Sequence, residues 1–260
     1  TALLDEMPAL AHLEAGGQGS QRALPAQFTV AAWNLERCLF PEASAAFLAA
    51  RAAAVVLLTE MDHGMARTGQ RNTTAAMAEA LGHSYLYGVE FFEMDLGGPI
   101  ERALCKDDHN ALGFHGNAIL SAVPAEATAL IRLPEPAYWF VPGTLANADE
   151  PRVGARMAVA AILPGRAGAV CVVSVHLESN ADAAYRARQF SHLLDEIDAF
   201  APDLPVLIGG DLNTGNHMPP DFDWRRETLF DDARARGYSW SATPDGITTQ
   251  KSRLTPRPTR

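Results

Sequence analysis

Four apolar stretches of the sequence end in polar side chains of the kinds that bind metal ions and phosphate groups. A single polar residue at such a place is more often just the solvated end of a strand. Ligands nevertheless gather at strand ends in α/β proteins, because the loops there are held by a rigid scaffold. Four such ends in one chain therefore indicate a site. The residues are Asn34 with Glu36, Glu60, His176, and Asp211 with Asn213.

The types of these residues favour one kind of chemistry. Two or three hard, partly anionic oxygen ligands without Cys or clustered His suit Mg²⁺ or Mn²⁺ better than Zn²⁺. A histidine and a second carboxylate beside such a metal can bind phosphoryl oxygens and orient or deprotonate a water. The sequence lacks the Gly-x-Ser-x-Gly motif of a serine nucleophile. Hydrolysis by a metal-activated water is the reaction that these residue types favour.

Two apolar strands and the helix between them position the first of these residues. Residues 28–36 and 55–60 are typical of strands buried on both faces, and residues 42–52 form an Ala-rich helical segment. A βαβ unit crosses over with a right hand and leaves both strand ends at one edge of the sheet. We therefore expect Asn34, Glu36 and Glu60 to lie together.

The other expected elements do not alternate regularly, which favours an α/β or α+β fold with a mixed sheet. Residues 88–112 are acidic and indicate a loop. The glycine-rich loops of dinucleotide and P-loop sites do not occur. We expect strands at residues 118–120, 156–163, 169–175 and 204–210, and helices at residues 73–81, capped by Asn72 or Thr73, and 182–200.

Five motifs in a fixed order resemble those of the endonuclease/exonuclease/phosphatase superfamily, a group of metal-dependent phosphohydrolases. Each motif is weak by itself, whereas the ordered set is specific. The resemblance runs from about Phe28 to Thr214. The motifs are Trp33-Asn34-Leu35-Glu36, Leu58-Thr59-Glu60-Met61-Asp62, Gly116-Asn117-Ala118-Ile119-Leu120-Ser121, Ser174-Val175-His176-Leu177-Glu178 and Gly209-Gly210-Asp211-Leu212-Asn213-Thr214.

The resemblance implies a four-layer α/β/β/α sandwich in which two mixed β-sheets pack face to face. It implies that Glu60 is the principal metal carboxylate, with Asn34 as its amide partner and Glu36 as a second ligand, for Mg²⁺ or Mn²⁺. It also implies that His176 binds or protonates the phosphate. Asp211 resembles the residue that activates the water, and Asn213 the one that orients it.

Other residues are candidates for binding the substrate, each with an ordinary structural alternative. Arg156 either contacts a phosphate or is a charged residue at a strand start. Asn117 either contacts the substrate or His176, or caps a turn. Tyr87 matches a site tyrosine of some relatives, although core packing is the commoner role. His63, Arg67, Arg71 and Asn72 either grip a second anionic group or form a solvated approach to a helix.

One part of the family pattern is missing from the sequence. The family ends in a strand followed by Ser-Asp-His, but the Asp-His pairs here, Asp62-His63 and Asp108-His109, come too early. We therefore expect a single domain over residues 28–260 that lacks its C-terminal strand. Residues 1–27 are expected to form a loosely ordered arm, or a short helix at residues 3–13.

The charge is distributed unevenly along the 260 residues. The net charge is −10, but residues 225–260 carry +4 and the remainder −14. An acidic body repels a long polyanion unless a basic groove or a metal offsets its charge. The charge therefore favours a phosphate-containing small molecule or a lipid headgroup over DNA or RNA, although an endonuclease or exonuclease remains the alternative.

The remaining expectations concern the state of the protein in the cell. Three cysteines cannot all pair, and no apolar stretch is long enough to cross a membrane. A cytoplasmic monomer is expected, with a secreted or periplasmic location left open because the chain begins with Thr1. The missing terminal motif also leaves open an inactive phosphate-binding pseudoenzyme.

Overall fold

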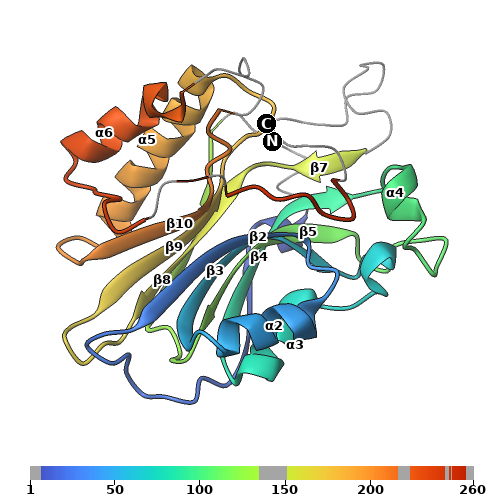
Figure 1. The fold of residues 1–260 in the computed structure, drawn as a ribbon, viewed down its shortest axis with the longest axis horizontal. Helices are drawn as coiled ribbons and strands as arrows, with labels where there is room; N and C mark the ends of the chain where they lie inside the picture. Colours follow the sequence, from blue (N-terminus) through green and yellow to red (C-terminus); the bar gives the residue numbers. More distant parts are fainter. Residues whose placement is uncertain (1–6, 135–150, 216–222, 244–245, 247, 256–260) are drawn as a thin grey trace.

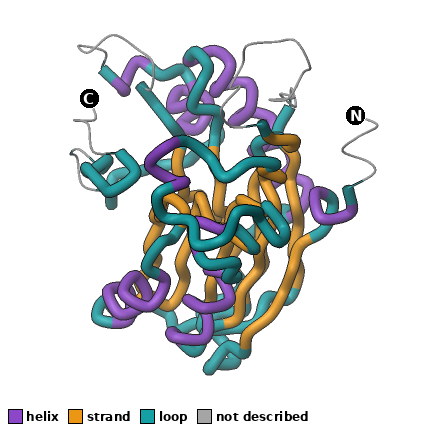
Figure 2. The backbone as a smooth tube through the Cα atoms, turned by 90° about the vertical axis from the view of Figure 1, so that its right-hand side faces the viewer, coloured by secondary structure: helices purple, strands orange, loops and turns teal. Residues whose placement is uncertain are grey.

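Two β-sheets packed face to face form the centre of the molecule, and helices cover the outer face of each sheet (Figure 1). The computed structural model describes residues 7–134, 151–215, 223–243, 246 and 248–255. In the second view the strands run between groups of helices (Figure 2). The predicted four-layer α/β/β/α sandwich with two mixed sheets is confirmed.

The larger sheet contains the strands that supply Asn34 and Glu60. Its strand order is β1-β4-β5-β3-β2, with β7 paired to the free part of β4. β2 and β3 are parallel, and the other pairs are antiparallel. The strands are β1 (Leu13–Gly17), β2 (Thr29–Arg37), β3 (Ala53–His63), β4 (Ser84–Glu93), β5 (Phe114–Ser121) and β7 (Arg152–Gly154).

Two helices cover the outer face of this sheet. α2 (Pro41–Ala49) connects β2 to β3, and α3 (Thr73–Leu81) connects β3 to β4. The side chain of Asn72 accepts a hydrogen bond from the backbone N–H of Ala75 and so caps α3, which ends at Gly82 with a φ of 64°. The helix predicted for residues 73–81 is confirmed.

The smaller sheet supplies His176 and Asp211. Its order is β10-β9-β8-β6, with β9 and β10 parallel and the other pairs antiparallel. The helices α5 (Ala183–Phe200) and α6 (Leu229–Ala235) pack on its outer face. The strands are β6 (Ala127–Arg132), β8 (Met157–Leu163), β9 (Val170–His176) and β10 (Val206–Asp211).

Three apolar clusters hold the four layers together. One joins the smaller sheet to α5 and α6, a second joins the larger sheet to α2 and α3, and a third fills the space between the sheets. Alternate residues of each strand enter different clusters, as period-2 geometry requires: Val55 and Leu57 face the other sheet, whereas Val56 and Leu58 face the helices. Short helical turns lie at Pro8–Leu10, Ala66–Thr68, Pro99–Arg102 (α4) and Trp224–Arg226.

The loop expected over residues 88–112 is wrong for its first part. Residues 88–93 continue β4, which pairs with β5 on one side and with β1 and β7 on the other. Glu90 and Glu93 made this stretch resemble a loop, but both are buried, at 0% and 7% exposure, against arginine side chains. Buried carboxylates that have ion-pair partners are compatible with a central strand.

The N-terminal segment also differs from the loosely ordered arm that was expected. Residues 13–17 form β1 at the edge of the larger sheet, and a single turn of 3₁₀ helix precedes it at Pro8–Leu10. Residues 1–6, part of the alternative helix, lie outside the described residues. Among the described helices, none is long and apolar enough to cross a membrane.

Candidate active site

Side chains from both sheets meet at one end of the space between the sheets. The side-chain nitrogen of Asn34, at the end of β2, donates to Glu60 Oε1 at 2.9 Å and to Asp211 Oδ2 at 2.8 Å. Glu60 belongs to β3 of the same sheet, whereas Asp211 ends β10 of the other. One amide therefore joins two carboxylates that the chain separates by some 150 residues.

A bulge in β3 brings Glu60 to this end. Leu58 and Met61 both face the helices, so the two residues between them cannot follow the regular alternation. The pairing of β3 with β5 shifts register between Leu58 and Met61, and Glu60 has a φ of 59°. This left-handed conformation is unfavourable for a residue other than glycine, and bulges often redirect a side chain next to a functional site.

Two glycines bring the smaller sheet close enough for Asp211 to reach Asn34. A Cβ atom on Gly209 would lie 2.8 Å from Leu57 Cδ1 and 2.9 Å from Ala32 Cβ, across the gap between the sheets. Gly210 has a φ of 136°, and a Cβ there would lie 2.0 Å from the carbonyl oxygen of Val175. The Gly-Gly-Asp sequence is thus required by packing immediately before the site.

Asp211 and His176 are neighbours on paired strands. They are partners in the register of β9 with β10, which are parallel, so both strands end at the same edge. The hydroxyl of Ser174 donates to the carbonyl oxygen of Leu58 at 2.8 Å and ties β9 to β3 below the site. The ends of β9 and β10 therefore lie together, and Asp211 lies against Asn34 at the end of β2.

Asn213 holds Asp211 through the backbone. Its N–H donates to Asp211 Oδ1 at 2.8 Å, while its side-chain amide donates to the carbonyl oxygen of Leu177 at 2.9 Å. Its φ of 49° is again left-handed. The contacts fix the direction of the Asp211 carboxylate, which leaves Oδ2 facing Asn34.

Glu36 does not join the carboxylate pair through its side chain. Its backbone N–H donates to Asn34 Oδ1 at 2.9 Å, which directs the nitrogen of that amide toward Glu60 and Asp211. Its carboxylate instead bonds to the hydroxyl of Thr255, in the segment near the C-terminus. Glu36 thus orients Asn34 in this structure.

His176 lies in a buried ionic cluster. Its Nδ1 is 3.2 Å from Glu90 Oε2, and Arg156 lies 2.6 Å from Glu90 Oε1 and 3.3 Å from Glu178 Oε2. Burial opposes ionisation of Glu90, but the charges of Arg156 and His176 and the hydrogen bond to His176 together lower the pKa of Glu90 to about 2. Arg156, a candidate phosphate ligand, is therefore engaged with two carboxylates beside His176. Glu90 was missed because the residues around it resemble a loop.

A second buried cluster reaches the site through Arg37. Its Nε donates to Glu101 Oε1 at 2.8 Å, and its terminal nitrogen forms an ion pair with Glu60 Oε2. Burial again opposes ionisation of Glu60, but the charge of Arg37 holds its pKa well below the usual range. Glu101 also contacts Arg67, which bonds to both oxygens of Asp62. Nothing in the local sequence marks Arg37 as a partner of Glu60.

Of the residues that follow Glu60, Arg67 is buried, whereas Arg71 is exposed and pairs with Glu42, and Asn72 caps α3 as a solvated approach to a helix would. The guanidinium of Arg67 is 1% exposed and bonds to Asp62 and Glu93, and His115 bonds to Asp62 Oδ1 at 2.8 Å. Burial favours the neutral form of Asp62, yet Arg67 outweighs it and lowers the pKa of this carboxyl. These residues support the 62–72 turn instead of facing a ligand.

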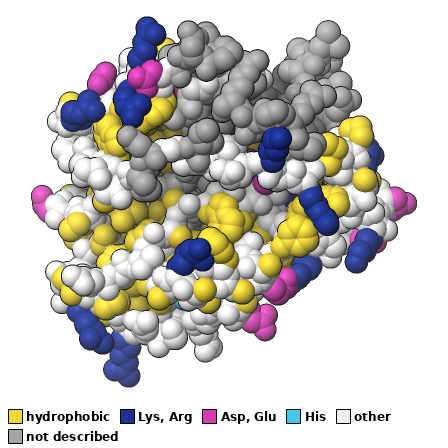
Figure 3. Space-filling view, viewed as in Figure 1, with side chains coloured by type: hydrophobic (Ala, Val, Ile, Leu, Met, Phe, Trp, Pro, Cys, Tyr) yellow, Lys and Arg dark blue, Asp and Glu magenta, His cyan; other side chains and the backbone are white. Residues whose placement is uncertain are grey.

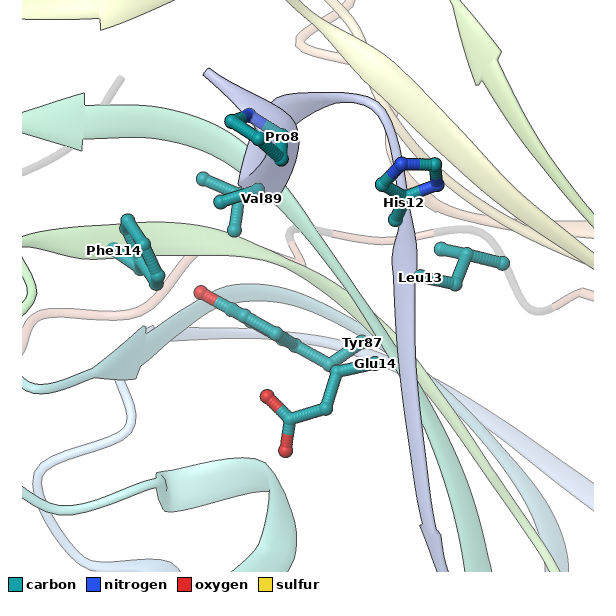
Figure 4. A pocket seen from close by; sticks show the side chains of 8 residues that line it. Pro8, His12, Leu13, Glu14, Tyr87, Val89 and Phe114 are labelled. Atoms are coloured by element: carbon teal, nitrogen blue, oxygen red, sulfur yellow. The ribbon is translucent and has the colours of Figure 1, made fainter.

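Tyr87 lies on the other face of the larger sheet. It packs with Val89 and Phe114 in the cluster under the helices, and its hydroxyl donates to the carbonyl oxygen of Met61 at 3.3 Å. It lines an outer cavity of about 300 Å³ beside Glu14 (Figure 4). The predicted substrate contact of Tyr87 therefore has no counterpart at the site, and its observed role is core packing.

Asn117 faces the space between the sheets from the middle of β5. Its amide nitrogen donates to the carbonyl oxygen of Met157 at 3.0 Å, and the side chain is fully buried. Its Oδ1 has no hydrogen-bond partner among the described residues. Asn117 joins β5 to the start of β8, below the site.

The donor set fits a hard divalent cation. Glu60 and Asp211 are two carboxylates within reach of one amide, and Mg²⁺ is commonly held by one or two carboxylates together with waters and a substrate phosphate. Within the described part of the chain, no three His, Cys, Asp or Glu side chains form a ready-made metal cluster. A cation here would bind to Glu60, with Asn34 and Asp211 beside it, and would compete with Arg37 for the Glu60 carboxylate.

The chain is similar to several solved structures, of which the first agrees with this architecture. An endonuclease/exonuclease/phosphatase from Beutenbergia cavernae DSM 12333 is 22% identical with a TM-score of 0.55, over 79% of this chain and 52% of that one. The chain thus spans about half the length of that protein. The catalytic domain of human Nocturnin with bound sulfate is 17% identical, with a TM-score of 0.46 over 77% and 68%. A truncated TDP2 from Caenorhabditis elegans is 18% identical, with a TM-score of 0.42 over 70% and 60%.

The structural likeness shows the fold, and a family model shows the relationship. None of the curated proteins compared with this chain matches it. The model described as the Endonuclease/Exonuclease/phosphatase family matches residues 31–260, which include all the side chains of the site. The chain belongs to the endonuclease/exonuclease/phosphatase family.

Proposed function

We propose that the protein hydrolyses phosphoester bonds with the help of Mg²⁺ or Mn²⁺, bound at Glu60 and Asn34. Members of its family are typically hydrolases, nucleases and phosphatases among them. The observation that carries the proposal is the amide of Asn34, which joins Glu60 of one sheet to Asp211 of the other. Two carboxylates at the mouth of a buried interface are costly unless a cation or a substrate uses them.

Asp211 and Asn213 act on the water. Asp211 Oδ2 faces the site while Oδ1 is held by the backbone of Asn213, so the carboxylate has one fixed direction. Asp211 takes a proton from the attacking water, whose oxygen forms the new bond to phosphorus as the ester bond breaks. Glu60 and Asn34 would hold a Mg²⁺ ion, which would polarise a phosphoryl oxygen and offset negative charge on the phosphoryl group.

His176 binds the phosphoryl group from the neighbouring strand. The buried carboxylate of Glu90 fixes its ring, and Arg156 adds positive charge next to it. His176 stabilises an anionic group at the strand ends, and the positive charge of Arg156 beside it assists this. Arg156 therefore acts on the phosphate through His176 and Glu90 in this proposal.

The proposed substrate is a small phosphoester or a lipid headgroup. A nuclease needs a basic track for several phosphates. On the face shown in Figure 3, the Lys and Arg side chains of the described residues are scattered among acidic and apolar ones. The charge of −14 on residues 1–224 adds to this argument. The cytoplasmic location and monomeric state expected from the sequence are part of the same proposal.

Substitution of the two carboxylates tests the proposed chemistry. We expect E60Q and D211N each to reduce hydrolysis of a generic phosphodiester by about a hundredfold or more, because each removes a charge from the site at nearly constant shape. The exposed Glu79 on α3 gives the matched control, E79Q. Full activity in E60Q or D211N would contradict the assignment.

A panel of substrates then distinguishes a small phosphoester or lipid substrate from a nucleic acid. Plasmid DNA, RNA, a phospholipid and several small phosphoesters are compared with the wild-type protein at two salt concentrations. We expect cleavage of the small or lipid substrates with little effect of salt. Preferential, salt-sensitive cleavage of nucleic acid would favour a nuclease, and absence of any cleavage would favour a phosphate-binding pseudoenzyme.

A further inference from the structure

Arg37 has an unusual backbone at the edge of the site. Three successive residues other than glycine, Glu36, Arg37 and Cys38, have positive φ angles of 47°, 75° and 53°. Such conformations persist only where the surrounding structure holds them, and they are concentrated at functional sites. The turn directs the Arg37 side chain back over the end of β3, toward Glu60.

The guanidinium of Arg37 joins the candidate metal site to the buried network behind it. Its Nε is held by Glu101 at 2.8 Å, and Glu101 is held in turn by Arg67 at 3.2 Å. Its terminal nitrogen reaches Glu60 Oε2, while Glu60 Oε1 is occupied by Asn34. The side chains of Arg37 and Glu60 are each 17% exposed, so the pair is partly accessible to solvent.

We propose that Arg37 is the exchangeable counter-cation of Glu60: a divalent metal displaces its terminal nitrogen from that carboxylate, and the freed nitrogen then binds a phosphoryl oxygen of the substrate. The inference rests on the proposed function, because it takes Glu60 as the metal carboxylate. Glu101 keeps Nε in place throughout, so only the terminal end of the guanidinium has to move.

Charge and geometry support this exchange. A guanidinium and a divalent cation repel each other, so both cannot bind the same carboxylate oxygen at little cost. The planar fork of arginine, once one edge is held by a carboxylate, presents its remaining N–H groups in a fixed direction suited to phosphate. A phosphate that binds both the metal and Arg37 compensates for the lost ion pair. Metal and phosphate binding are therefore expected to assist each other.

Binding of Mn²⁺ measures the exchange without any catalysis. Free Mn²⁺ is determined by its electron paramagnetic resonance signal in titrations of the wild type, R37M and E60Q, each with and without inorganic phosphate. Without phosphate we expect R37M to bind Mn²⁺ about tenfold more tightly than the wild type, because no ion pair has to be broken. We expect phosphate to tighten Mn²⁺ binding about fivefold or more in the wild type and little in R37M.

Control variants distinguish the exchange at Arg37 from the metal site at Glu60. The exposed Arg71, which pairs with Glu42, provides the matched variant R71M, and it should behave as the wild type. If R37M does not fold without metal, recovery of its melting transition by Mn²⁺ supports the exchange. If it does not fold with Mn²⁺ either, R37K is titrated, and tighter Mn²⁺ binding with a smaller phosphate effect than in the wild type is expected.

Two outcomes would overturn the inference. Equal or weaker Mn²⁺ binding in the Arg37 variant, with an undiminished effect of phosphate, contradicts the exchange while leaving the metal site intact. Mn²⁺ binding that E60Q leaves unchanged, or no Mn²⁺ binding to the wild type, instead contradicts the proposed metal site, and the inference fails with it.

Discussion

A single amide at the end of β2 serves both carboxylates of the site. Asn34 donates from one nitrogen to Glu60 and to Asp211, and its oxygen is fixed by the backbone of Glu36. An aspartate has nearly the same shape but offers no N–H group. At this position a donor joins the two carboxylates, whereas an acceptor would add to their repulsion.

The variant N34D tests this role of Asn34. It would place a third carboxylate against Glu60 and Asp211, and their repulsion should destabilise the metal-free protein by about 1–3 kcal/mol. For a chain of this length the melting temperature should fall by about 3–10 °C in the presence of a chelator. Mg²⁺ should restore more stability to N34D than it adds to the wild type. Equal melting temperatures of both proteins in chelator would refute the expectation.

At the scale of elements, irregular strands place the side chains of the site. β3 bulges at Glu60, β2 shifts its register between Asn34 and Arg37, and β10 ends in two glycines before Asp211. A strand without these features would direct alternate residues to opposite faces. The bulges let neighbouring residues contribute to one site, at the cost of locally unfavourable backbone.

Close contact between the sheets at Gly209 leads to a prediction about packing. A side chain there would collide with Ala32 Cβ and Leu57 Cδ1, so G209V should destabilise the fold by about 1–3 kcal/mol and displace Asp211. We expect a lower urea midpoint together with reduced activity. Gly98 has no atom within 4 Å of an added Cβ, which makes G98A the control. A midpoint for G209V equal to that of the wild type would contradict the expectation.

At the scale of the whole molecule, ionic cross-links accompany the apolar core. Glu90 on the larger sheet pairs with His176 of the smaller sheet and with Arg156, which immediately precedes β8 of that sheet. Glu93 on the same strand pairs with Arg67. Burial opposes ionisation of both carboxylates, but the neighbouring arginines and histidines together lower the pKa of each to about 2. The fold therefore depends on two buried groups that must be charged.

Because Glu90 and Glu93 must be charged in the folded protein, we expect the folding stability to decrease as the pH falls. In the unfolded chain Glu90 and Glu93 have pKa values near 4.3, above their folded values of about 2, so the unfolded state binds protons first as the pH falls. Stability should be fully present above about pH 5 and should decrease between about pH 4.5 and pH 2. Urea unfolding at a series of pH values measures it.

The variant E90Q provides the comparison for the pH series. It should be less stable than the wild type near neutral pH, because Arg156 loses a buried charged partner, and its stability should depend less on pH in the acid range. The exposed E79Q should follow the wild type throughout. A wild-type stability that is constant from pH 5 to pH 2 would show that these pairs do not control the acid transition.

Much of the site could be predicted from the sequence because strand ends are local features. An apolar run that stops at a carboxylate, an amide or an imidazole is visible at Asn34, Glu60, His176 and Asp211. The right-handed crossover rule then placed Asn34 and Glu60 at one edge, where the structure has them. The ordered motifs gave the family, and with it the four layers.

Only the tertiary structure decided which charges meet. Arg37 contacts Glu60, 23 residues away, and Glu101, 64 residues away. Glu90 contacts His176, 86 residues away, and no local sequence pattern encodes any of these pairs. Tyr87 illustrates the same limit. The face of β4 on which it lies depends on how that strand pairs, and the glutamates of β4, which are buried, made the stretch resemble a loop in the sequence. A sequence determines where a strand ends by its local composition, whereas the partner of a buried charge is determined by how the sheets pack.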